Sequence, residues 1–146
     1  ETLFLGERLG KCLQRGDIIF LLGDLGSGKT ALTQGICHGL GLKKDIYIRS
    51  PTFTIINEYY CNHPIYHIDL YRLDSIFEIE ALGLEEYLSS SGICIIEWAE
   101  KLSDKSNKDL GLKIEKRIEI HIEIKEENNR IFKIKTVGQS HRTISL

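Results

Sequence analysis

The chain has 146 residues, a formal net charge of −2 and a hydrophobic fraction of 42%. This is the length of about one domain, so we expect residues 1–146 to form a single domain with its own core. Uninterrupted aliphatic or aromatic runs reach only four or five residues, too few to span a membrane, and we expect no membrane partner. The four cysteines include no C-x-x-C pair, which favours reduced thiols in a cytoplasmic protein.

The first part of the chain predicts a helix and then a buried strand. Leu5, Leu9 and Leu13 recur every four residues, which predicts a helix over residues 2–14. Residues 18–22 are all apolar, a pattern typical of a parallel strand buried on both faces. A glycine-rich turn follows directly, at the strand end where ligands bind in open α/β sheets.

This turn matches the phosphate-binding pattern G-x-x-x-x-G-K-[ST]. It consists of Gly23, Asp24, Leu25, Gly26, Ser27, Gly28, Lys29 and Thr30, called the P-loop below. Its glycines allow the backbone to approach phosphates closely, and the helix that follows offers free N–H groups to an anion. Lys29 can bridge the β- and γ-phosphates, and Thr30 is the usual hydroxyl ligand of Mg²⁺. The pattern predicts a nucleoside-triphosphate site.

The elements after the P-loop alternate between helical and β patterns. Apolar residues at every fourth position predict a helix that ends near Gly39 or Gly41. Further β segments are expected at residues 46–48, 54–60 and 65–70, and short helices within residues 76–89.

Ser50-Pro51-Thr52 resembles a switch loop. Pro51 restricts Ser50 to an extended conformation, and the Thr52 hydroxyl could sense the γ-phosphate or the metal. An ordinary turn before a strand is the alternative interpretation.

In the β segment over residues 65–70, His67 and Asp69 share one face with the residue that follows the segment, Tyr71. We predict that Asp69 binds a water of the Mg²⁺ ion or positions the attacking water. A polar pair that braces a loop is the alternative interpretation.

Glu97 directly follows a second apolar run, residues 93–96. It therefore lies at the carboxyl end of a predicted buried strand, the Walker B position, where an acid helps to hold Mg²⁺ or orients a water. A solvated carboxylate at the end of a strand is the alternative.

The C-terminal part predicts a β-hairpin after a polar loop at residues 103–111. Isoleucines alternate with charged residues or histidine over residues 118–124, and a second alternating strand surrounds residues 132–135. Residues 101–146 carry 11 basic and 7 acidic side chains. This charge suits a solvated hairpin, and direct tRNA binding is left open. Together the elements predict an α/β fold: a P-loop NTPase-type, mostly parallel sheet flanked by helices, with an antiparallel C-terminal β-hairpin.

Four segments in this order resemble the bacterial TsaE family, the small ATPases of tRNA threonylcarbamoyladenosine biosynthesis. They are the P-loop, Ser50-Pro51-Thr52-Phe53-Thr54, His67-Ile68-Asp69-Leu70-Tyr71-Arg72-Leu73 and Ile96-Glu97-Trp98. The P-loop alone is generic, whereas the ordered set is specific. The resemblance extends from about residue 2 to residue 100, with a looser match beyond.

The resemblance implies an ATPase that works with TsaB and TsaD, which attach threonylcarbamoyl to N6 of A37 in tRNA, and that contacts tRNA indirectly or weakly. It implies ATP and Mg²⁺ as ligands, with Thr30 and Glu97 holding the metal and the P-loop holding the phosphates. Lys29, Asp69, Glu97 and Thr52 are then the expected catalytic residues, and Trp98 is also expected to be important.

Other functions are less well supported by the sequence. A small-molecule kinase is the main alternative, but 7 arginines in 146 residues leave little for an arginine-rich lid. Asn107-Lys108-Asp109 nearly matches the guanine-reading pattern of GTPases, with the aspartate one residue early. A nucleotide-dependent binding module without relevant hydrolysis is a third class. Cys61, His63 and His67 lack a fourth zinc ligand by spacing.

Overall fold

The computed structural model describes residues 1–102, 112, 114–126, 128–138 and 143–146. Within them the elements are α1 (Thr2–Cys12), β1 (Ile18–Leu22), α2 (Lys29–Gly39), β2 (Ile56–Tyr60), β3 (Pro64–Asp69), α3 (Ile76–Glu80), α4 (Leu84–Leu88), β4 (Ile93–Glu97), the 3₁₀ helix η1 (Ala99–Leu102), β5 (Arg117–Glu126) and β6 (Asn129–Val137).

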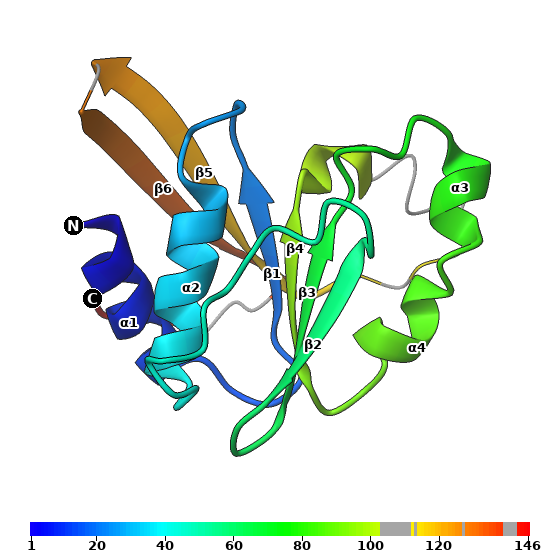
Figure 1. Cartoon of the computed structure of the whole chain (residues 1–146), viewed down its shortest axis with the longest axis horizontal. Helices are drawn as coiled ribbons and strands as arrows, with labels where there is room; N and C mark the ends of the chain where they lie inside the picture. Colours follow the sequence, from blue (N-terminus) through cyan, green and yellow to red (C-terminus); the bar gives the residue numbers. More distant parts are fainter. Residues whose placement is uncertain (103–111, 113, 127, 139–142) are drawn as a thin grey trace.

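One six-stranded sheet organises these elements, in the order β2-β3-β4-β1-β5-β6 (Figure 1). β1 pairs in parallel with β4 on one side and with β5 on the other, and β3 pairs in parallel with β4. The two outermost strands, β2 and β6, are antiparallel to their neighbours. The predicted mostly parallel α/β sheet with a C-terminal hairpin is thus confirmed.

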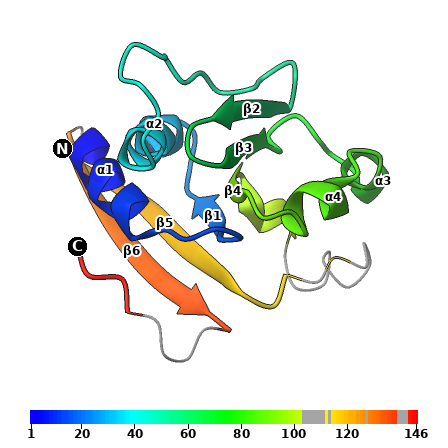
Figure 2. The ribbon, with the colours of Figure 1, turned by 90° about the horizontal axis from the view of Figure 1, so that it is seen from below.

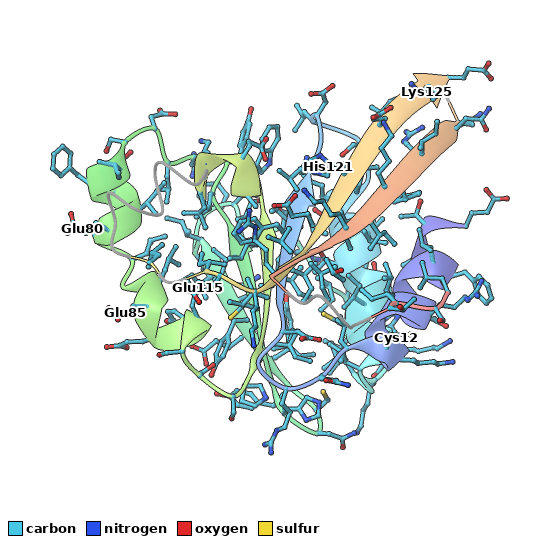
Figure 3. All side chains as sticks on the ribbon, turned by 180° about the vertical axis from the view of Figure 1, so that it is seen from behind. Cys12, Glu80, Glu85, Glu115, His121 and Lys125 are labelled. Carbon is cyan, nitrogen blue, oxygen red and sulfur yellow. The ribbon has the colours of Figure 1, made fainter. Side chains whose placement is uncertain are left out.

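Helices cover both faces of this sheet. Figure 2 shows α1 and α2 on one side and α3 and α4 on the other. Each face has its own buried cluster, and β1 supplies both: Ile19 and Leu21 to the α1/α2 side, Ile18 and Phe20 to the α3/α4 side. This double burial explains why the predicted strand contains no polar residue. In Figure 3, Glu80 on α3 and Glu85 on α4 lie on the outside of these helices.

Two expectations from the sequence are wrong, and a third concerns residues that the structure does not describe. The strand predicted at residues 46–48 is wrong: the chain turns at Ile46, whose N–H donates to the Lys43 carbonyl, and Ile48 is buried by packing without pairing with a strand. The first helix ends at Cys12, not at residue 14. The predicted polar loop at 103–111, with the Asn107-Lys108-Asp109 segment, lies outside the described residues.

In the part of the chain that the structure describes, no helix combines the length and the apolar character needed to cross a membrane. Of the cysteines, Cys37 and Cys94 are buried, and burial raises the pKa of each of these two thiols to about 12.

The helix that carries the P-loop lysine is held against α1 by glycines. Gly6 and Gly10 of α1 face Gly35 and Gly39 of α2, and a Cβ atom at any of these positions would meet backbone atoms of the other helix. At Gly35 it would lie 2.3 Å from the carbonyl oxygen of Leu3. The two backbones are therefore too close for any larger residue.

We expect Gly35→Ala to destabilise the fold by about 1–3 kcal/mol, because the separation of the helices that a methyl group requires outweighs the better helix propensity of alanine. Chemical denaturation measures this, with Lys11→Ala as the control, since Lys11 is exposed on α1. An unchanged free energy of unfolding in Gly35→Ala would contradict the close packing of α1 and α2.

Candidate nucleotide-binding site

A cavity of about 490 Å³ opens at the carboxyl ends of β1, β3 and β4. The P-loop connects β1 to α2 on one side of it, and the end of β4 and the segments next to β3 form the other side. Its lining consists of Leu25, Gly26, Gly28, Lys29, Thr30, Ala31, Ser50, Thr52, Asp69, Tyr71, Glu97 and Trp98. All four predicted catalytic residues therefore reach one cavity.

The P-loop backbone has the conformation that its glycines predict. Gly26 and Gly28 have φ angles of +77° and +104°, which residues with a Cβ rarely adopt. Gly23 also has a positive φ, +150°, and a Cβ there would in addition lie 2.6 Å from the Ile122 carbonyl oxygen of β5. The loop is thus shaped by its own glycines and by the neighbouring strand.

The P-loop is also tied to the C-terminal hairpin. Arg130 of β6 donates from Nε to the Ser27 carbonyl oxygen over 3.3 Å. The Ser27 side chain is buried, and its Oγ has no hydrogen-bond partner among the described residues. The Arg130 bond therefore holds the P-loop against the hairpin, and the Ser27 side chain is not among the residues that line the cavity.

The Lys29 side chain folds back over the P-loop. Its Nζ donates to the carbonyl oxygens of Gly23, at 2.5 Å, and Asp24, at 2.9 Å. It also lies 4.0 Å from the centre of the Trp98 ring, a cation–π contact. Burial lowers the pKa of this ammonium group, and the nearby carboxylates, Glu97 foremost, oppose the shift.

Glu97 is buried at the end of β4, with 2% of its surface exposed. Its Oε2 lies 3.2 Å from Thr30 Oγ1, on the cavity side. Its Oε1 accepts from His67 Nε2 at 2.7 Å and from Thr33 Oγ1 at 3.4 Å. The alternative interpretation, a solvated carboxylate, is excluded by this burial.

Asp69 lies at the end of β3, directly beside Glu97 in the sheet register. Its Oδ2 accepts a short hydrogen bond from Ser50, and its Oδ1 accepts from the Tyr71 N–H at 2.9 Å. Thr52 follows on the same loop as Ser50 and is exposed. Asp69 therefore connects the end of the sheet to the loop that carries Thr52.

These residues fit a hard divalent cation next to a triphosphate. Thr30 supplies a hydroxyl oxygen and Glu97 a carboxylate oxygen, both preferred by Mg²⁺, which normally takes few protein ligands and completes its shell with phosphate oxygens and water. The described residues contain no group of three or more His, Cys, Asp or Glu side chains able to hold a metal alone. The zinc interpretation of Cys61, His63 and His67 therefore finds no support in these residues.

Sequence reasoning missed several features of this site. Thr33 reaches Glu97 from one turn further along α2. Trp98 has a left-handed backbone, with φ +59°, and its ring lies against Tyr71 at 4.9 Å. A conformation so rare for a bulky residue marks a constrained position. Arg49 and Arg72 do not line the cavity and stack instead on Tyr47 and Phe53.

Comparisons with known proteins indicate the family of the chain. The family model described as "Threonylcarbamoyl adenosine biosynthesis protein TsaE" matches residues 1–132. The tRNA threonylcarbamoyladenosine biosynthesis protein TsaE of Bacillus subtilis is 42% identical over 106 residues, which make up 72% of this chain and 65% of that protein. The protein of the same name from Synechocystis is 48% identical over 102 residues, 66% of this chain and 63% of its own length.

A solved structure gives the same result for the fold. The crystal structure of Bacillus subtilis YdiB superposes with a TM-score of 0.71 at 32% identity, covering 94% of this chain and 79% of that one. The matched region spans slightly less than two thirds of the curated relatives from Bacillus and Synechocystis. The match to the family model over most of the sequence, together with these identities, establishes that the chain belongs to the TsaE family.

Proposed function

We propose that the chain is an Mg²⁺-dependent ATPase of tRNA N6-threonylcarbamoyladenosine biosynthesis, acting with TsaB and TsaD to drive or reset their complex. The observation that carries the proposal is the arrangement of Lys29, Thr30 and Glu97 around one cavity, with the Thr30 hydroxyl 3.2 Å from the Glu97 carboxylate. The pathway comes from the family, which is a family of threonylcarbamoyl adenosine biosynthesis proteins.

The P-loop holds the phosphates in this proposal. The N–H groups at the start of α2 and the positive end of its dipole face an anion that lies in the loop. Lys29 leaves the carbonyl oxygens of Gly23 and Asp24 for the phosphate oxygens, a stronger, charge-assisted bond. Gly26 and Gly28 keep the approach open because they carry no side chain.

Thr30 and Glu97 hold the metal, directly or through water. When bound there, Mg²⁺ neutralises the charge of the phosphate oxygens. Asp69, next to Glu97 in the sheet, orients a water molecule, and Thr52 senses the γ-phosphate from the loop that Ser50 ties to Asp69. Their positions support these roles because both residues line the cavity opposite the P-loop.

The partners and the compartment follow from the pathway. In this proposal TsaB and TsaD carry out the threonylcarbamoyl transfer, tRNA contacts this chain indirectly or weakly, and the chain acts in the cytoplasm. A small-molecule kinase is the alternative that an experiment must distinguish from the proposed ATPase. Neither Arg49 nor Arg72 lines the cavity, so neither supports the charge-stabilising role that a kinase lid arginine would have.

Trp98 provides a test of nucleotide binding, since it is the only tryptophan in the chain. We expect ATP with Mg²⁺ to change its fluorescence, because phosphate oxygens draw the Lys29 ammonium away from the ring. A titration of emission against ATP measures this, and Lys29→Ala is the control in which the ATP-dependent change disappears. Saturable ATP binding by calorimetry with constant Trp98 emission would show that Lys29 does not move.

Lys29→Ala should lower ATP hydrolysis by a factor on the order of 100 or more, through loss of the charge that bridges the phosphates. Lys44→Ala, which removes a lysine on the surface near α1, should retain wild-type turnover. Hydrolysis is measured with the chain alone and with TsaB–TsaD, with and without tRNA. Stimulation by the partners supports the proposal, whereas turnover that appears only with a small phosphoryl acceptor supports a kinase.

Glu97→Gln should abolish Mg²⁺-dependent hydrolysis and leave ATP affinity without Mg²⁺ close to wild type, because the amide keeps the size of the side chain and loses its charge. Glu100→Gln is the matched control, since Glu100 is a nearby carboxylate on the exposed side of η1. If Glu97→Gln hydrolyses ATP with the Mg²⁺ dependence of wild type, Glu97 is not a metal-binding acid.

A further inference from the structure

His67 occupies a position where the surroundings call for an apolar residue. It lies in the middle of β3, opposite Ile95 of β4, with none of its surface exposed. Ile65, two residues earlier on the same face, and Ile95 both belong to the core beneath α2. A histidine there has to give up its hydration for a single polar contact, which is costly unless that contact is strong.

That contact is to Glu97. His67 Nε2 lies 2.7 Å from Oε1, within the range of a charge-assisted hydrogen bond to a carboxylate. Because an ionised carboxylate only accepts, the Nε2 atom carries the hydrogen. The other ring nitrogen, Nδ1, is buried without a hydrogen-bond partner among the described residues. The imidazole is therefore placed for Glu97 alone and not for a wider polar network.

The two carboxylate oxygens of Glu97 therefore contact different groups. Oε1 faces the interior, where His67 donates to it at 2.7 Å. The Thr33 hydroxyl adds a weaker contact at 3.4 Å, because its single hydrogen is shared with the Lys29 carbonyl oxygen, 3.0 Å away. Oε2 is left on the side of Thr30, 3.2 Å from its hydroxyl. A carboxylate held at one oxygen cannot rotate freely, so its second oxygen stays directed at the cavity. Outer groups that orient a metal ligand in this way commonly change metal affinity or activity by 10–100-fold when they are removed.

We propose that His67 is a positioning residue, which fixes the Glu97 carboxylate so that Oε2 faces the Mg²⁺ site at Thr30, and that Thr33 assists it. The inference rests on the proposed function, because it assumes that Glu97 and Thr30 hold the metal. It adds a residue that touches neither phosphate nor metal. A break in the apolar pattern of a buried strand is the kind of exception that functional sites require.

The test compares two substitutions of His67. Leucine fills the space and removes the donor, whereas glutamine places an amide N–H near the position of Nε2. Ile65→Val is the control for altered packing, since Ile65 lies on the same face of β3 and is buried. Circular dichroism and thermal unfolding establish that each variant folds.

Two readouts separate positioning from a structural role. Mn²⁺ binding in the presence of ADP, followed by electron paramagnetic resonance, reports the metal site without turnover. The Mg²⁺ concentration at half-maximal ATP hydrolysis reports it during turnover, and Trp98 fluorescence gives the nucleotide affinity without metal.

We expect His67→Leu to weaken Mn²⁺ binding and raise the Mg²⁺ requirement about 10-fold or more, with metal-free nucleotide affinity unchanged. His67→Gln should restore both values to within a few-fold of wild type, and Thr33→Val should shift them in the same direction by a smaller factor. Ile65→Val should leave them unchanged.

The inference is wrong if folded His67→Leu binds Mn²⁺ like wild type, or if His67→Gln is as impaired as His67→Leu. Should His67→Leu fail to fold, the result depends on the other two variants. A wild-type Mn²⁺ affinity in Thr33→Val, or a strongly reduced one in His67→Gln, would then overturn the inference. The proposed function fails separately, and is recognised by a wild-type chain whose nucleotide binding and hydrolysis do not depend on Mg²⁺.

Discussion

The buried carboxylate of Glu97 is the constraint around which this site is built. A carboxylate with 2% exposure is stable only if donors or a cation replace the water it has lost. The fold supplies three donors from two elements: Thr30 and Thr33 from α2, and His67 from β3. Strand β4 can bring Glu97 to this point because its neighbours on both sides are parallel, so that their carboxyl ends meet at one edge of the sheet.

The position of α2 is equally constrained, because two of these donors lie on it. Four glycines let α1 pack so closely on α2 that the backbones of the two helices touch. On the other side of the P-loop, the C-terminal hairpin contributes the Ile122 carbonyl next to Gly23 and the Arg130 bond to Ser27. The P-loop therefore lies between α1, near the N-terminal end of the chain, and β5 and β6, near its C-terminal end.

The sequence predicted those parts of the site whose residues are close along the chain. The P-loop was recognisable because eight successive residues carry the pattern, and Glu97 because it ends an apolar run. The alternation of His67 and Asp69 with apolar residues placed both on one face of β3. Positions on a continuous element can be read from spacing, since the backbone geometry of a strand or helix converts spacing into direction.

Contacts between distant segments could not be read in this way. Thr33 and Glu97 are 64 residues apart, and Arg130 and Ser27 are 103 apart. Nothing in one sequence says which of several threonines or arginines meets a given partner. The strand expected at residues 46–48 failed for a related reason. Ile48 is apolar because it packs into the core, and a short apolar segment does not reveal whether it also pairs with a strand.

The site finally divides into a fixed part and an exposed part. The P-loop, Glu97 and His67 lie within or directly beside the sheet, whereas Thr52 lies on an exposed loop between α2 and β2. This loop is tied to the fixed part by the Ser50–Asp69 hydrogen bond and by Arg72, which donates to the Thr52 carbonyl at 3.4 Å and stacks on Phe53. Phe53 itself is 85% exposed. If the P-loop and Glu97 hold the nucleotide and its metal as proposed, a contact at the exposed loop can move Thr52 relative to Asp69 without displacing the strands of the sheet. Under the proposed function, a partner that contacts this loop can control hydrolysis through Thr52 and leave the P-loop and Glu97 in place.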